Sequence, residues 1–431
     1  MSRASASGLP QVRPKADLVL EDCTQLLTCK PGSKDLVGLV GHGWVAAAGG
    51  RILAAGSRRD VLDAVDTGAA QVFSGKDKVV VPGFVDAHTH LVFGGSRVKE
   101  YAARMVHDDP ETLRRLGIKT GIMATVAMTR NSTEEELYRA AAGRLRHMLQ
   151  SGSTTVESKS GYGLSLHSEL KILELNRRLD QDLPVDVVST FLGAHGWPDD
   201  IPKDKYIDML LQEMLPLVAQ ERLARFCDVW CDEGHYTAAE SGRILRAARD
   251  HGLEPKIHTD AYSYIGGSDL AAEMGMASAD HLNYTPPEAI RKLARKGVPG
   301  VLLPAIDFAV KHPRPFQARP MLEEGLDLAL ATNCCPGCYV ESMPLVLALA
   351  CREHRMSAEE AIRAATLGGA RALGLEHDRG SLEPGKLADL QVWDAHQYEE
   401  IIYRIGGNLV ERVFKNGRCV VDTTGQGGRE P

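Results

Sequence analysis

Two hydrophobic patterns alternate through the middle of the chain. Short apolar runs that end in polar residues, such as 153–163 and 184–196, predict buried strands. The longer segments between them, such as 168–181 and 205–222, carry apolar residues at helical spacing and predict amphipathic helices. This alternation favours an α/β fold with parallel strands and crossover helices, and a TIM-like (β/α)8 barrel is the common way to close so many units.

The two ends of the chain have a different pattern. Residues 16–81 consist of short apolar runs bounded by turn residues, and residues 378–431 repeat that style, with an Asn-Gly pair at 416–417 that is typical of a tight hairpin. We therefore predict three parts. They are a disordered tail at 1–15, a composite β-sandwich domain built from both ends, and a barrel at 82–377.

Composition and charge narrow the class of protein. A chain of 431 residues with 44% hydrophobic and 25% charged residues has the composition of a large globular protein. A net charge of -7 gives no reason to expect a nucleic-acid or membrane partner. There is no apolar run of signal-peptide or membrane-span type, so we expect a cytoplasmic protein. Nine scattered cysteines are expected to be reduced thiols.

The strongest chemical signal is the run VVVPGFVDAHTH. His88 and His90 stand two apart on an apolar strand, so both imidazoles point to one face and can bind one cation. A lone buried histidine is more often a hydrogen-bonded core residue, but a pair at this spacing favours a site for zinc, iron or another divalent transition metal. Other strand runs end in polar residues, which a barrel would bring to the same edge: 157–162, His195, His258, His281 and Asn333.

Several longer stretches resemble a known family. PGFVDAHTH, KIHTD, ADHL and the closing GSLEPGKLADLQVWD resemble the amidohydrolase superfamily over nearly the whole chain. SGSTTVESKSGYGL, TFLGAHGWP and RIGGNLVERVFKNG resemble its imidazolonepropionase branch more narrowly, which opens a ring in histidine breakdown. The resemblance implies a metal-dependent hydrolase barrel, a β-sandwich made from both ends, one divalent metal ion with zinc favoured over iron or manganese, and a homodimer.

The resemblance also implies a metal centre. Matched by motif, His88, His90 and His258 would be the metal ligands. Three protein ligands and an open fourth position form a common catalytic zinc arrangement, in which the ion activates a water. His281 would lie near the metal as a catalytic group that handles protons. The alternative for His281 is a hydrogen-bonded core histidine.

Three further residues are expected around a small substrate with a carboxylate arm. The resemblance places Arg97 of GGSR, Tyr162 of SGYG and His195 of GAH there. Arg97 can grip the carboxylate with its fork, Tyr162 can donate a hydrogen bond to it, and His195 can polarise a ring carbonyl. The alternatives are a solvated surface charge for Arg97 and a packed aromatic residue for Tyr162.

Two positions depart from the pattern of the family. Its HADE signature reads HTDA here, so Ala261 replaces an acidic residue expected to hold the ring nitrogen or the attacking water. Its strand-end ATD reads ATN, so Asn333 replaces the carboxylate expected to touch the metal and to accept a proton. An amide cannot accept a proton at neutral pH, and losing a general base typically costs about 10² to 10⁴ in rate. An engineered change would explain Asn333 alone, but not Ala261 and the cysteines that follow.

These departures lead us to favour a changed substrate. The favoured hypothesis is attack on the carbon between the ring nitrogens of a 2-thioxo or 2-methylthio imidazolone propionate from ergothioneine-type catabolism, giving hydantoin propionate and sulfide or thiol. Ala261, Cys334 and Cys335 would give that pocket room and polarisable walls. The first alternative is imidazolonepropionase itself, which opens 4-imidazolone-5-propionate to N-formiminoglutamate. The second is a catalytically inactive binding protein.

Two open points concern the proton and the thiols. Because Asn333 cannot be a base, His281 or Asp260 would have to move the proton. Cys334 or Cys335 would serve as a fourth metal ligand in one interpretation, since thiolate binds zinc strongly. In the other interpretation these thiols only fill space, and Cys338 fits this second interpretation at least as well.

Overall fold

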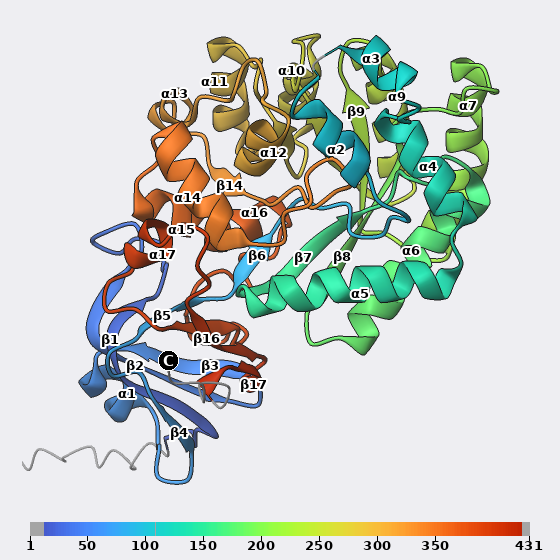
Figure 1. The fold of residues 1–431 in the computed structure, drawn as a ribbon. Coiled ribbons are helices and arrows are strands. Elements are labelled where there is room, and N and C mark those ends of the chain that lie inside the picture. Colours follow the sequence, from blue (N-terminus) through green and yellow to red (C-terminus); the bar gives the residue numbers. More distant parts are fainter. Residues whose placement is uncertain (1–12, 108, 425–431) are drawn as a thin grey trace, which may run out of the picture.

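A barrel forms the larger part of the protein. The computed structural model describes residues 13–107 and 109–424, and Figure 1 shows the barrel with its helices above a separate sheet. Eight parallel strands follow one another in chain order around the barrel, which confirms the predicted TIM-like fold. They are β6 (Phe84–Asp86), β7 (Ser153–Lys159), β8 (Asp186–Ala194), β9 (Phe226–Cys231), β11 (Ile257–Thr259), β12 (Ala279–His281), β13 (Gly300–Leu302) and β14 (Leu328–Leu330), and a short β10 (Glu254–Pro255) pairs with β9.

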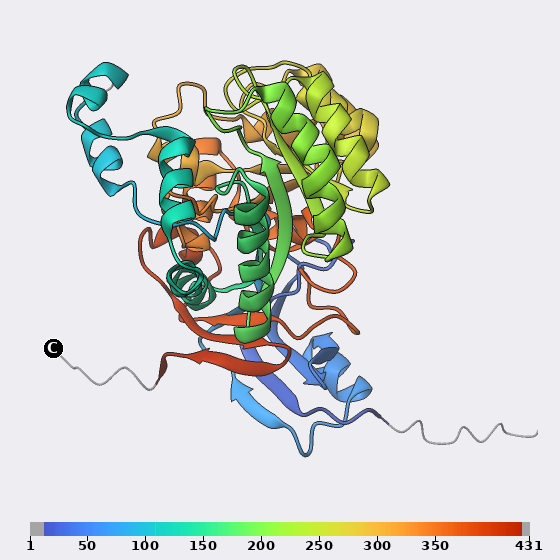
Figure 2. The ribbon, with the colours of Figure 1, turned by 90° about the vertical axis from the view of Figure 1, so that its right-hand side faces the viewer.

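Helices connect these strands and cover the barrel. Capping boxes begin several of them, for instance at Thr133 before α5 and at Thr237 before α9. The helices between β6 and β9 are α2 (Val98–Arg104), α3 (Pro110–Arg115), α4 (Gly121–Asn131), α5 (Glu134–Gln150), α6 (Leu166–Asp182), α7 (Lys203–Met209), the π-helical turn η1 (Leu210–Met214) and α8 (Leu215–Gln220). Figure 2 shows that the segment carrying α2 and α3 projects from the barrel.

The second half of the barrel repeats this arrangement. They are α9 (Ala238–Asp250), α10 (Gly267–Met274), α11 (Pro287–Lys296), α12 (Pro304–Ala309), α13 (Ala318–Glu323), α14 (Met343–His354), α15 (Ala358–Arg363), the π-helical turn η2 (Ala364–Gly368) and α16 (Gly369–Ala372). None of the helices in the described ranges combines the length and apolar character that crossing a membrane requires.

The seam between the first and last strands is closed by the segments around them. The backbone N–H of Asn333 donates to His88 O at 3.1 Å, and that of His90 donates to Cys334 O at 2.9 Å. Behind the seam, η2 and α16 lie against β14 and β6. A Cβ on Gly368 would stand 2.1 Å from Leu328 O, and one on Gly369 would stand 2.1 Å from Val85 O. Only glycine lets the helix approach the seam this closely.

Both chain ends form one mixed sheet beside the barrel. The order is β17 (Arg418–Asp422), β16 (Val410–Lys415), β15 (Leu390–Trp393), β5 (Val79–Pro82), β1 (Leu18–Leu27), β2 (Leu39–Ala48) and β3 (Arg51–Gly56), with β4 (Gln71–Ser74) paired to β1. The antiparallel pairing of β15 with β5 joins the two ends, as the sequence predicts. Helices α1 (Arg58–Ala64) and α17 (Glu400–Tyr403) belong to these end segments.

The predicted domain limits remain a prediction. Of the tail expected at 1–15, residues 1–12 lie outside the described residues. Lys15 pairs with Asp66, so the described end of this segment lies against the sheet domain.

Candidate metal and substrate site

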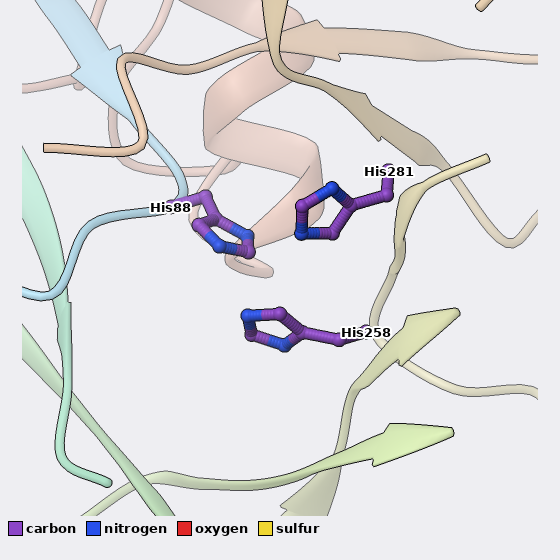
Figure 3. A group of neighbouring side chains, drawn as sticks. All are labelled: His88, His258 and His281. Atoms are coloured by element: carbon purple, nitrogen blue, oxygen red, sulfur yellow. The ribbon is translucent and has the colours of Figure 1, made fainter. Parts of the chain in front are cut away.

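Five histidine side chains gather where the barrel strands end. His88 and His90 follow β6, His195 follows β8, His258 lies on β11, and His281 ends β12. The ring centroids of His88 and His258 are 4.4 Å apart, those of His88 and His90 5.5 Å, and those of His258 and His281 5.3 Å. Figure 3 shows the rings of His88, His258 and His281 turned toward one another. The predicted meeting of strand-end histidines is therefore observed.

The nitrogen atoms of these rings have the spacing of metal ligands. His88, His258 and His281 form one group, and His90, His195 and His258 form another, each with its nitrogens within 4.8 Å of one another. Nε2 of His88 and Nε2 of His258 are buried and have no hydrogen-bond partner among the described residues. Buried imidazole nitrogens without partners fit a bound cation. The set His88, His90 and His258 stays a prediction, because the groups also include His281 and His195.

Burial keeps four of these five imidazoles uncharged. Burial lowers the pKa of His88, His90 and His281 well below the ordinary value of a histidine, and it lowers the pKa of His195 to about 3. A neutral imidazole has one nitrogen with a free lone pair. The cluster therefore offers several lone pairs at neutral pH.

Two aspartates orient two of the histidines. His88 Nδ1 lies 2.7 Å from Asp280 Oδ2, and His258 Nδ1 lies 2.9 Å from Asp228 Oδ2. Burial opposes ionisation of Asp228, but His258 and Lys159 lower the pKa of its carboxyl group well below the usual range. Each carboxylate oxygen accepts a hydrogen bond from Nδ1–H and leaves Nε2 free, which is the usual arrangement of a metal-binding histidine.

Sequence reasoning gave this layer of charged residues no role. Asp228 interrupts the apolar strand β9, Asp280 interrupts β12, and Lys159 ends β7, all with fully buried side chains. Charged residues are almost never fully buried unless they are paired. That rule could have marked Asp228 in the apolar run FCDVW.

His195 is held in one orientation. Its ring stacks on His90, with centroids 4.8 Å apart and an interplanar angle of 11°. Its Nδ1 lies 3.2 Å from Gly161 O, and a carbonyl can only accept. The neutral ring therefore carries its proton on Nδ1 and presents Nε2 as an acceptor. The sequence argument expected His195 to polarise a ring carbonyl by donating a hydrogen bond to it. Nε2 of this tautomer carries no proton and cannot donate that bond.

Tyr162 and Arg97 lie on the same side of the site. The Tyr162 ring is 5.3 Å from that of His195 and 5.5 Å from that of His90, and burial raises the pKa of its hydroxyl well above the usual value. Arg97 already holds a carboxylate, because its Nε and Nη2 donate to Glu100 at 2.6 and 2.8 Å. Sequence reasoning missed Glu100.

A cavity of about 450 Å³ opens beside this group. Arg97, Glu100, Arg104 and Tyr262 are among its lining residues, whereas the five histidines are not. The cavity therefore exposes the Arg97–Glu100 pair but does not contain the histidine cluster.

Asn333 occupies a special backbone position. Its φ of 49° lies in the left-handed region, which asparagine adopts more readily than most residues. The side chain is 5% exposed, and its Oδ1 is buried without a hydrogen-bond partner in the described structure. The structure therefore holds a neutral amide oxygen beside His88, to whose carbonyl the Asn333 backbone is bonded.

The three thiols after Asn333 are structural neighbours of the site. Cys335 and Cys338 exchange two backbone hydrogen bonds of 3.1 Å around a Pro-Gly turn. Burial raises the pKa of Cys334, Cys335 and Cys338, so all three are neutral thiols. Within residues 13–107 and 109–424, none of the groups with metal-ligand spacing contains a cysteine. The geometry therefore gives no support to Cys334 or Cys335 as a fourth ligand.

In the loop after β11, the side chain of Asp260 and the carbonyl of Ala261 bond to residues outside the histidine cluster. Asp260 accepts hydrogen bonds from Thr259 Oγ1 at 2.8 Å and Thr285 Oγ1 at 2.6 Å. Ala261 is 1% exposed, and its carbonyl oxygen lies 2.9 Å from His312 Nε2. Neither residue belongs to a group with metal-ligand spacing. His281 is therefore better placed than Asp260 to move a proton at the cluster.

Comparison with known proteins supplies the family. The profile of the Amidohydrolase family matches residues 229–420. An imidazolonepropionase from Alkaliphilus metalliredigens is 41% identical and covers 94% of this chain and 98% of its own length. Another from Geobacillus thermodenitrificans is 46% identical over 82% of this chain and 84% of its own. The chain belongs to the imidazolonepropionase-like amidohydrolases.

Two solved structures have the same fold. An adenosine deaminase from Xanthomonas campestris with bound zinc has a TM-score of 0.71 at 20% identity, covering 95% of this chain and 94% of its own. A mutant atrazine chlorohydrolase from Arthrobacter aurescens, in complex with zinc and atraton, has a TM-score of 0.71 at 19% identity, covering 94% and 95%. These likenesses support the fold, and the family membership makes this amidohydrolase a hydrolytic enzyme.

Proposed function

We propose that the protein opens 4-imidazolone-5-propionate to N-formiminoglutamate. The observation that carries this proposal is the 41% identity to an imidazolonepropionase across almost the entire length of both chains. The histidine cluster at the barrel mouth supports it, because it offers the ligand atoms that such a hydrolase needs. The comparisons favour this reaction over the sulfur-substituted substrate inferred from Ala261 and Asn333.

The histidines and aspartates at the barrel mouth would hold and orient the metal ion for this reaction. A divalent cation held by His88, His258 and either His90 or His281 would polarise the substrate and lower the pKa of a water. Asp280 and Asp228 fix the rings so that Nε2 is free. Zinc is proposed because neutral imidazoles suit it well, and the same ligands suit iron better than manganese.

Other residues hold the substrate and the proton. Tyr162 and Arg97 would bind the carboxylate arm, and Arg97 would exchange Glu100 for the substrate as it does so. His195 presents a lone pair at Nε2 and would accept a hydrogen bond from a ring N–H. With His90 as the third metal ligand, His281 would be free to carry the proton to the departing nitrogen.

The test uses purified enzyme loaded with zinc, iron or manganese. Formation of N-formiminoglutamate is followed by chromatography and mass spectrometry. His258→Gln should abolish turnover, and His42→Gln, at a side chain that is 78% exposed, should leave it unchanged. If no metal form produces N-formiminoglutamate, the proposal fails.

A second candidate reaction rests on Asn333. Its amide cannot replace a carboxylate base, and a thiolate leaves more readily than an amide nitrogen. Attack of water on a 2-thioxo ring would replace C=S by C=O and release hydrogen sulfide, leaving hydantoin propionate. Incubation with the 2-thioxo and 2-methylthio substrates, with detection of sulfide or methanethiol, distinguishes this reaction. Release of neither product excludes it.

The oligomer is a separate proposal. We propose a homodimer on the resemblance described above. Light scattering coupled to size-exclusion chromatography should give twice the chain mass of 46.8 kDa. A monomer mass at micromolar concentration would contradict the proposal.

A further inference from the structure

Beneath the histidine cluster, the barrel encloses a group of charged side chains. Glu157, Lys159, Asp228, Lys256 and Asp280 are each 0% exposed. They come from β7, β9, β12 and the residue before β11. Burial of so many charges is costly unless each has a partner, so the pairing pattern is informative.

Lys159 stands between the two aspartates that orient metal-site histidines. Its Nζ lies 2.7 Å from Asp228 Oδ2 and 3.3 Å from Asp280 Oδ2. The same two oxygens contact the Nδ1 atoms of His258 and His88. One ammonium group therefore links two histidine-aspartate pairs that come from different strands.

Lys256 has an equal charge and equal burial and shares the partner Glu157 with Lys159, but its other contact differs. Its Nζ donates to Glu157 Oε1 at 2.8 Å and to Ala87 O at 3.2 Å. In the described residues it forms no ion pair with Asp228 or Asp280. It therefore provides a matched control for Lys159.

We propose that Lys159 is a positioning residue that holds the imidazole rings of His88 and His258 in the orientation needed to bind one metal ion. This inference rests on the metal site of the proposed function. Asp228 and Asp280 have carboxylate oxygens within 4.8 Å of each other and of His258. Like charges at this separation repel strongly in a buried site. Lys159 balances that repulsion and keeps both carboxylates turned toward the histidines. Without it, the rings lose their common orientation.

The test measures zinc affinity in Lys159→Met and Lys256→Met. Dissociation constants come from competition with a chromophoric chelator, and the visible spectrum of the cobalt-loaded protein reports ligand geometry. Loss of partners that orient metal ligands typically weakens affinity roughly 10- to 100-fold. We expect that loss and an altered cobalt spectrum in Lys159→Met, and a much smaller loss in Lys256→Met.

Two results overturn the proposal. One is wild-type affinity in Lys159→Met, and the other is an equal loss in both variants, which would show that the buried charges act only on general stability. If Lys159→Met does not fold, Lys159→Arg and Lys256→Arg replace the pair, and equal zinc affinity in these two variants again overturns the proposal. Zinc affinity is measured without substrate, so a failure of the proposed ring opening leaves this test intact.

Discussion

Replacing Asn333 with aspartate should restore a base to the site. The change is isosteric, and aspartate tolerates the φ of 49° about as well as asparagine does. The backbone bond from Asn333 N to His88 O involves no side-chain atom and would survive. The new carboxylate would take the place of the buried Oδ1 that now has no partner among the described atoms.

The expected magnitude follows from the chemistry of the group. A positioned general base contributes about 10² to 10⁴ in rate, which corresponds to roughly 2.7 to 5.4 kcal/mol of barrier. The side chain at this position is 5% exposed, so an ionised carboxylate without a cation beside it would be costly. The metal-free variant should therefore be less stable than the metal-free wild type, and metal should restore the stability.

The assay compares kcat for opening of 4-imidazolone-5-propionate in Asn333→Asp and in the control Asn416→Asp. Asn416 also has a positive φ, of 50°, but lies in the hairpin between β16 and β17. An increase of at least about 10² in kcat in the first variant alone supports the assignment. Unchanged rates in Asn333→Asp, alone and together with Ala261→Glu, would show that residue 333 does not face the reacting atoms.

Three further predictions concern the substrate arm, the pH dependence and the barrel seam. Arg97→Met should raise KM for imidazolone propionate with little change in kcat. The surface variant Arg139→Met should leave both constants unchanged, and equal kinetics in the two variants would contradict the role of Arg97. The pKa of His195 falls from 6.5 to about 3 on folding. Between these two pH values the unfolded chain binds a proton at His195 and the folded chain does not. The metal-free protein should therefore lose stability as pH falls from 6.5 toward 3. Denaturant unfolding should show a smaller loss over this range in His195→Gln, and an identical loss would contradict the assignment. Gly369→Ala should destabilise the protein by roughly 1 to 3 kcal/mol. The control Gly143→Ala, in α5 with open space around it, should be neutral or stabilising by up to about 1 kcal/mol. Equal melting temperatures of the two variants would refute the close approach at the seam.

The sequence predicts the features that depend on local periodicity. The spacing of His88 and His90 places both side chains on one face, and the alternation of strands with helices places the later histidines at the same edge of the barrel. The pairing of β15 with β5 agrees with the shared pattern of the two ends. Each of these follows from a period or from a rule of topology.

Contacts across the barrel could not be predicted in the same way. Lys159 meets Asp228 and Asp280 because of the register and tilt of three strands, and no local pattern encodes that register. The hydrogen bond that fixes the tautomer of His195 depends on the carbonyl direction of Gly161. These contacts decide what the histidines can do chemically.

The closed seam between β14 and β6 has a consequence for how the enzyme matures. His88 lies just after the first barrel strand and Asn333 just after the last, and they become neighbours only when the seam closes. Contacts between residues so far apart in sequence form late and slowly in folding. A nascent chain that still lacks β14 would carry all the proposed histidine ligands, but His88 and His90 would lack the backbone bonds to Asn333 and Cys334 that hold them in place. Tight metal binding becomes a marker that the whole barrel has been synthesised and closed.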